Sequence, residues 1–121
     1  MVLYLIKNIL EAAGYKVEVG SKVEGLSGVI HDFDILAYKG ETTLGIITGG
    51  EDFHVSYVVS LVKALDIKNT CVILLIEKKY AKSESKSFKN FHLLVYDDQE
   101  DLERKLKELI NVCENSSGKY E

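Results

Sequence analysis

The stretch Gly25–Glu51, GLSGVIHDFDILAYKGETTLGIITGGE, decides the fold of this chain. Its middle predicts a β-hairpin with a strand over Val29–Tyr38, a turn at Lys39–Glu41 and a returning strand over Thr42–Thr48. The glycine within the turn adopts the positive φ that tight turns need at little cost. The hairpin therefore places two antiparallel strands side by side early in the chain.

An acidic residue, Asp34, lies in the apolar part of the first hairpin strand, between Phe33 and Ile35. A charge among buried neighbours needs a partner or a functional role. His31 is three residues away, so a regular strand points the two side chains to opposite faces, and their direct pairing needs a bulge. We expect Asp34 either to be held by backbone donors or His31, or to contact a metal ion or a phosphate.

Helix and strand patterns continue on both sides of the hairpin. Apolar residues at helical spacing predict an N-terminal helix that stops at Gly14, followed by a strand at Tyr15–Val19 and a loop at Gly20–Gly28. A second helix after the hairpin is marked by five apolar residues at helical spacing, namely Val55, Val58, Val59, Val62 and Leu65.

The last third of the chain predicts two more strands and a helix. Thr70–Ile76 is a continuous apolar run, as expected for a strand that is covered on both faces. The lysine-rich segment Glu77–Asn90 is expected to be a loop with a short helix that docks Phe88. Phe91–Tyr96 is another strand, and a capping box at Asp97–Glu100 begins the final helix.

The resulting order, αβββαβ(α)βα, predicts an α/β fold with a mixed central sheet and helices on both faces, in three layers α/β/α. A flavodoxin-like fold needs strict alternation of strands and helices, and the hairpin argues against it. The 121 residues suffice for one domain with a modest core. We assign that domain to residues 1–113 and expect a flexible tail at 114–121.

Composition and charge limit the classes of function. The chain is 46% hydrophobic, has a net charge of −4, and contains no apolar run of the ~18 residues that span a membrane. We therefore expect no membrane partner, and the two cysteines, expected as thiols, make a reducing cytoplasm the natural setting. A domain that lives mainly on DNA usually has a basic surface, so general DNA binding is disfavoured, whereas a local basic patch is compatible with this charge.

The two cysteines, Cys71 and Cys113, lie far apart in the sequence. We expect two buried or half-buried thiols in preference to a disulfide or a metal-binding pair, which remain the alternatives.

The element order and the hairpin residues together resemble the PD-(D/E)XK, or restriction-endonuclease-like, superfamily, in the style of archaeal Holliday-junction resolvases and Mrr-type endonucleases. The resemblance covers about residues 2–110. Glu11 lies late in the first helix, where many members have a glutamate. GLSGVIHDFDILA resembles the glycine-rich approach to the strand with the first catalytic aspartate, which would be Asp34. LGIITGG resembles the strand that carries the family's Glu-x-Lys motif.

The resemblance implies Mg²⁺-dependent cleavage of DNA, in which two carboxylates bind the ion and a lysine orients or activates the nucleophilic water. The matching positions for the Glu-x-Lys motif are Ile47, Thr48 and Gly49. Neither Ile47 nor Gly49 supplies the required group, so we expect the standard nuclease chemistry to be lost. Asp34 and Glu11 are then residual catalytic residues, and the domain requires no cofactor.

A replacement metal site would use residues at the start of the second helix. Glu51, Asp52 and His54 cluster there, and with Asp34 they would bind Mg²⁺ in an active enzyme whose ligands had migrated. The simpler interpretation is that acids near a helix N-terminus are favoured by the helix dipole. Both interpretations stay open at this point.

The candidate for nucleic-acid contact is a lysine-rich run near the start of the last third. Its lysines are Lys78, Lys79, Lys82, Lys86 and Lys89. The aromatic residues among them are able to stack on bases, and they are Tyr80, Phe88 and Phe91. Glutamates are interleaved, so a solvated surface segment is the simpler interpretation.

The sequence therefore predicts a catalytically degenerate nuclease-fold domain that acts as an accessory or binding protein in nucleic-acid processing. Its partner would be DNA or a protein of a DNA-processing complex. The alternatives are an active Mg²⁺-dependent DNA endonuclease with migrated ligands, and a structural or protein-interaction homodimer that uses an apolar helix face.

Overall fold

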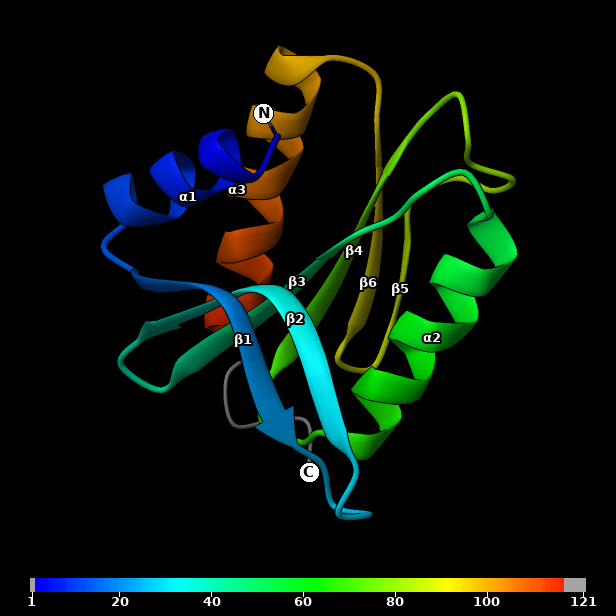
Figure 1. The fold of residues 1–121 in the computed structure, drawn as a ribbon. Helices are drawn as coiled ribbons and strands as arrows, with labels where there is room; N and C mark the ends of the chain where they lie inside the picture. The colour runs from blue at the N-terminus through cyan, green and yellow to red at the C-terminus, as the bar shows by residue number, and fades with distance from the viewer. Residues whose placement is uncertain (1, 117–121) are drawn as a thin grey trace.

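Three helices pack against one sheet in the computed structural model, which describes residues 2–116 (Figure 1). The elements are α1 (Val2–Ala12), β1 (Lys16–Glu24), β2 (Ile30–Lys39), β3 (Thr42–Thr48), α2 (Phe53–Asp66), β4 (Cys71–Glu77), β5 (Lys86–Phe88), β6 (Phe91–Tyr96) and α3 (Gln99–Asn115). All the strands belong to a six-stranded sheet with the order β1-β2-β3-β4-β6-β5. The predicted α/β fold with a mixed central sheet is confirmed.

The sheet is antiparallel at its edges and parallel in its centre. β1, β2 and β3 pair antiparallel, β3 pairs parallel with β4 and β4 with β6, and β5 runs antiparallel along β6. The predicted hairpin is the β2–β3 pair, and Gly40 in its turn has a φ of +57°. The parallel strands β3 and β4 are joined through α2, the kind of crossover that a parallel connection requires.

Helices cover both faces of the sheet, so the fold has three layers. Figure 1 shows α1 and α3 on one side of the sheet and α2 on the other. The central strand β4 is buried from its first to its sixth residue, and its side chains alternate between the two cores. One set packs with α1 and α3, namely Cys71, Ile73 and Leu75. The other set packs with α2, namely Val72, Leu74 and Ile76.

Helix α2 turns an apolar stripe to solvent. The apolar residues that mark it in the sequence are 45–59% exposed, and they are Val55, Val58, Val59, Val62 and Leu65. The side that packs on the sheet carries Phe53, Ser60 and Ala64. Ser60 and Ala64 are small, so the helix can lie close to the sheet. The side of α2 that is buried is therefore the side that packs closely on the sheet, and not the side that carries the most apolar residues. Neither α2 nor any other helix of residues 2–116 is long and apolar enough to cross a membrane.

Two segments differ from the elements expected for them. Gly20 has a φ of +67° within β1, so the strand continues to Glu24 and the loop expected at 20–28 is shorter. The segment 77–90 contains strand β5 where a short helix is expected, because these residues pair with the edge of β6. Phe88 is 55% exposed and is not docked.

The ends of α3 are shifted from their predicted positions. The N-cap is Asp98, whose side chain accepts a hydrogen bond from the Asp101 N–H, so the cap begins one residue later than predicted. The helix continues to Asn115, so the expected domain boundary at 113 falls inside it. Glu114 accepts a hydrogen bond of 2.6 Å from the Tyr15 hydroxyl, which ties this end of the helix to the sheet. Residues 117–121 of the expected tail lie outside the described residues.

Cys71 and Cys113 form a disulfide, so the expectation of two thiols is wrong. Cys71 begins β4 and Cys113 lies near the end of α3. Their Cα atoms are 6.1 Å apart, a separation that a disulfide bridges. The two residues meet because α3 packs across the sheet face that carries Cys71, an approach between residues 42 positions apart that spacing in the sequence does not reveal.

Candidate functional site

Asp34, the residue expected to bind a metal, is held by Thr48. Its Oδ2 accepts a hydrogen bond of 2.7 Å from the Thr48 backbone N–H and one of 2.9 Å from Thr48 Oγ1. Asp34 lies in β2, and Thr48 is the last residue of β3. Asp34 is half-buried. A backbone donor therefore satisfies Asp34, as one interpretation of the sequence predicts, and His31 has another partner.

The two positions that would carry Glu and Lys in the family motif face the core beneath α2. Ile47 packs against that core. A Cβ on Gly49 would lie 2.0 Å from Ile76 Cδ1 and 3.3 Å from Leu74 Cδ1. A lysine at position 49 would therefore require Ile76 to move out of a packed core, which adds a steric argument to the missing amine.

The other face of β3 does not supply the motif either. Side chains alternate along a strand, so the residues on the Asp34 side are Thr48 and, two positions away in each direction, Ile46 and Gly50. Ile46 is buried in the core under α1 and α3. Neither face of this segment thus offers a second carboxylate or an amine beside Asp34.

The remaining candidate ligands do not gather into a site. Asp52 is the N-cap of α2, and its side chain accepts a hydrogen bond of 3.1 Å from the backbone N–H three residues later. Glu11, Glu51 and His54 are exposed. Within residues 2–116, neither Asp34 nor any of these four residues belongs to a group of three or more ligand side chains that are close enough to hold one metal ion.

His31 binds Asp66, the last residue of α2, and not Asp34. Its Nε2 lies 2.7 Å from Asp66 Oδ2, while Ser27 donates to the same carboxylate from its N–H at 2.9 Å and from its Oγ at 2.7 Å. The hydrogen bond to His31 and then those to Ser27 lower the pKa of Asp66. The serine hydroxyl donates to the carboxylate and not to the imidazole, so the three residues do not form a nucleophilic triad. They fasten the β1–β2 loop to the end of α2.

Gly25 packs against the Asp66 carboxylate in this loop. A Cβ there would lie 1.9 Å from Asp66 Oδ2 and 3.1 Å from the Asp66 carbonyl oxygen. We predict that Gly25→Ala lowers the free energy of unfolding by about 1–3 kcal/mol, because the carboxylate and the backbone must both shift. Urea denaturation measures the change.

The matched control for this substitution is Gly50→Ala, because a Cβ on Gly50 would meet nothing within 4 Å. The control is expected to change the unfolding free energy by less than about 0.5 kcal/mol. Equal effects of the two substitutions would contradict the close contact between Gly25 and Asp66.

The five lysines of the predicted nucleic-acid run are all exposed. Three of them lie over aromatic rings: Lys79 over Tyr80 at 5.0 Å, Lys86 over the α2 residue Tyr57 at 5.1 Å, and Lys89 over Phe88 at 5.5 Å. Phe91 is 1% exposed and belongs to the core, so it is not available for stacking on a base. The ring of Phe88, on β5, is exposed and is available for stacking on a base.

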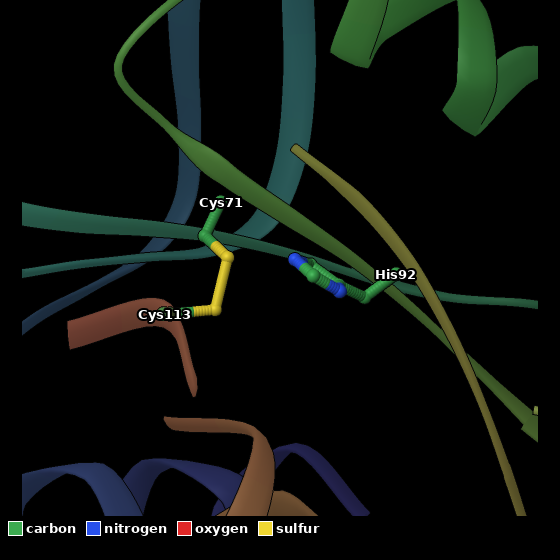
Figure 2. A group of neighbouring side chains, drawn as sticks. All are labelled: Cys71, His92 and Cys113. Atoms are coloured by element: carbon green, nitrogen blue, oxygen red, sulfur yellow. A yellow bond between two sulfur atoms is a disulfide. The ribbon is translucent and has the colours of Figure 1, made fainter. Parts of the chain in front are cut away.

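The group of ligand side chains that does gather is Cys71, His92 and Cys113 (Figure 2). All three residues are buried, and one ligand atom from each lies within 4.8 Å of the others. Burial lowers the pKa of the His92 imidazole, which favours its neutral form. The sequence analysis kept a metal-binding pair of Cys71 and Cys113 as an alternative and missed His92, whose signal is a single polar residue in the apolar strand Phe91–Tyr96.

Comparison with known proteins supports the fold alone. The structure is similar to the crystal structure of AF1548, a protein of unknown function, with a TM-score of 0.51 and 16% sequence identity. The similarity covers 67% of this chain and 50% of that chain, so the match spans half the length of AF1548. No family model matches the chain, and no curated protein matches it significantly.

Proposed function

We propose that this chain is a PD-(D/E)XK-like domain that has lost its catalytic site and acts as an accessory or binding protein in nucleic-acid processing. The observation that carries the proposal is the bonding of Asp34. The carboxylate that the resemblance assigns to metal binding accepts two hydrogen bonds from Thr48, which stands in the strand where the family has its Glu-x-Lys motif.

Coordination chemistry supports the loss of activity. Mg²⁺ needs near-octahedral oxygen coordination and is usually held by one or two carboxylates with waters and substrate phosphates. Two donors occupy Oδ2 of Asp34, and within residues 2–116 Asp34 belongs to no group of three or more ligand side chains that could hold one metal ion. A side chain at position 49 would have to displace Ile76 Cδ1. Ile47 and Gly49 supply neither the carboxylate nor the amine that the family's mechanism uses at these two positions.

We predict no cleavage of four-way junction, single-stranded or duplex DNA in the presence of Mg²⁺ or Mn²⁺, because the ion lacks ligands and the water lacks an activating lysine. Gel electrophoresis of end-labelled DNA measures the reaction. Asp34→Ala is expected to leave the same background as the wild type.

The matched control is Asp32→Ala, which removes an exposed carboxylate of the same strand that pairs with Lys22. Cleavage by the wild type and Asp32→Ala that is abolished in Asp34→Ala would overturn the proposal. That outcome would establish the alternative, an active Mg²⁺-dependent endonuclease with migrated ligands.

The exposed lysines between residues 78 and 89 are the proposed contact with nucleic acid. We predict that replacing Lys82, Lys86 and Lys89 by Ala weakens the binding of single-stranded and junction DNA, because phosphate contacts and their released counterions are lost. Fluorescence anisotropy at several salt concentrations measures the affinity. The salt slope of duplex binding is expected to fall by about 0.9 for each phosphate contact that is lost.

The control for this experiment removes three exposed lysines from other elements, namely Lys16, Lys68 and Lys107. Equal losses in both triple variants would indicate a nonspecific charge effect and contradict a site at β5. If the wild type binds no DNA at low salt, the proposed DNA contact is wrong and a protein partner is favoured instead.

The exposed stripe of α2 favours a second candidate function, a homodimer or protein-interaction domain. Its five apolar residues are each at least 45% exposed, and the stripe continues through Val62 and Leu65 to Val29 of the neighbouring loop. Contiguous exposed apolar surface of this kind is typical of interaction sites. A twofold contact between two copies of α2 would cover the same stripe on both subunits.

We predict that the wild type forms a dimer by sedimentation velocity and that Val58→Glu with Val62→Glu makes it monomeric, because the contact would bury unpaired charges. The control carries the same substitutions at two exposed valines outside the stripe, Val19 and Val112. A wild type that is monomeric at high protein concentration would refute self-association through α2.

A further inference from the structure

The cluster of Cys71, His92 and Cys113 joins three elements on the sheet face beneath α3. Cys71 begins β4, Cys113 lies in α3, and His92 is the second residue of β6. The parallel register pairs His92 with Ile73, two residues after Cys71, so the imidazole and the Cys71 side chain lie on the same face. Figure 2 shows the imidazole extending toward the disulfide with a ring nitrogen at its leading end.

The two nitrogens of His92 have different surroundings. Nδ1 lies 2.6 Å from Ser87 Oγ of strand β5. Nε2 is buried and has no hydrogen-bond partner within residues 2–116. A buried polar atom without a partner costs free energy, so its presence calls for an explanation, such as a ligand that it binds in another state of the protein. Since Nδ1 is attached next to the side-chain stem and is engaged by Ser87, the nitrogen that faces the sulfur atoms is Nε2.

We propose that reduction of the Cys71–Cys113 disulfide converts this cluster into a zinc site with Cys71 Sγ, Cys113 Sγ and His92 Nε2 as its three protein ligands. A dithiol supplies two electrons and two protons, the S–S bond breaks, two protein thiols form, and the dithiol becomes a cyclic disulfide. Zn²⁺ then replaces both thiol protons, which are released to solvent. An oxidant of the disulfide class reverses the sequence and expels the ion.

The geometry fits one tetrahedral ion. With Zn–S bonds of about 2.3 Å and a Zn–N bond of about 2.0 Å, the ligand atoms of one site lie about 3.5–3.8 Å apart. The three ligand atoms here lie within 4.8 Å of one another, and opening the disulfide moves its sulfurs toward the required separation. Cys71 and His92 lie on strands that pair directly, so their separation is fixed by the sheet. The movement that opens the site on reduction is therefore mainly that of Cys113 on α3.

Ser87 supplies the outer contact that a zinc-bound histidine needs. A histidine that binds zinc through Nε2 carries its proton on Nδ1, and that N–H is then able to donate to Ser87 Oγ at the observed 2.6 Å.

A surface pocket borders one member of the cluster. It has a volume of about 370 Å³ and lies between β5, β6 and α3, with His92, Leu109 and Val112 in its wall. Three protein ligands leave the fourth position of tetrahedral zinc for water. The proposal is independent of DNA binding, and its test uses neither DNA nor cleavage.

The test compares oxidised and reduced full-length protein. The protein is reduced with dithiothreitol, desalted without oxygen, mixed with one equivalent of Zn²⁺ and desalted again before the metal is measured by mass spectrometry. We expect one bound Zn²⁺ per reduced chain and none per oxidised chain. Zinc is also expected to protect both thiols from alkylation, and circular dichroism checks that the reduced chain is folded.

Substitutions assign the ligands. Ser87→Ala is expected to weaken zinc binding by about tenfold to hundredfold, as changes outside the ligand shell do, and His92→Gln by more than that. The matched control is His54→Gln, which removes an exposed histidine and is expected to leave zinc affinity unchanged.

Three results would overturn the zinc site. The first is a reduced chain that stays folded and binds no zinc. The second is equal zinc affinity in His92→Gln and the wild type. The third is a reduced chain that unfolds and does not recover its circular dichroism when zinc is added, since a site of this kind should couple binding to folding.

Discussion

Strand β4 is the constraint on which the rest of the fold depends. It is buried on both faces, with alternate side chains in the core under α1 and α3 and in the core under α2. A strand of this kind offers no polar face, so helices must cover it on both sides and its neighbours must satisfy its backbone groups. β3 and β6 do so as parallel partners. The positions of α2, α3 and the disulfide all follow from covering this one strand.

The packing around position 49 is a consequence of the same constraint. Ile76 of β4 fills the space that a side chain at position 49 would need, and Leu74 adds to that wall. The end of β3 is therefore shaped by core packing, with Gly49 accommodating the neighbouring strand. Asp34 retains an acid at the edge of this packed region and receives both of its hydrogen bonds from Thr48. Asp34 is half-buried, and its two hydrogen bonds link β2 to the last residue of β3.

The hairpin and β4 were predictable because local patterns define them. The turn glycine and the alternation around it define the β2–β3 pair, and a continuous apolar run defines a doubly covered strand. The partner of Asp34 was not predictable in this way. The hairpin register ends at Ile35 opposite Ile46, and continuing it would place Ile47, not Thr48, opposite Asp34.

Other features depend on tertiary packing and were not predictable. The exposed stripe of α2 has the spacing of a buried helix face. The opposite side of the helix carries small residues that allow closer packing, and that side contacts the sheet. The disulfide depends on the path of α3 across the sheet, which brings together residues that no local pattern connects. His92 is one polar residue in a buried strand, and its role emerges only with Cys71 and Cys113 beside it.

The proposed zinc cluster is not a relocated nuclease site, for reasons of position and of chemistry. The register of β3 and β4 pairs Leu44 with Cys71 and Thr48 with Leu75, so Cys71 and the Asp34–Thr48 pair lie at opposite ends of these strands. Four residues of strand separate them by about 13 Å. Carboxylates suit Mg²⁺, whereas two thiolates and an imidazole select a softer ion such as Zn²⁺. The Asp34–Thr48 pair at one end of these strands and the cluster of Cys71, His92 and Cys113 at the other are therefore separate features of the fold, and the two proposals built on them can hold independently.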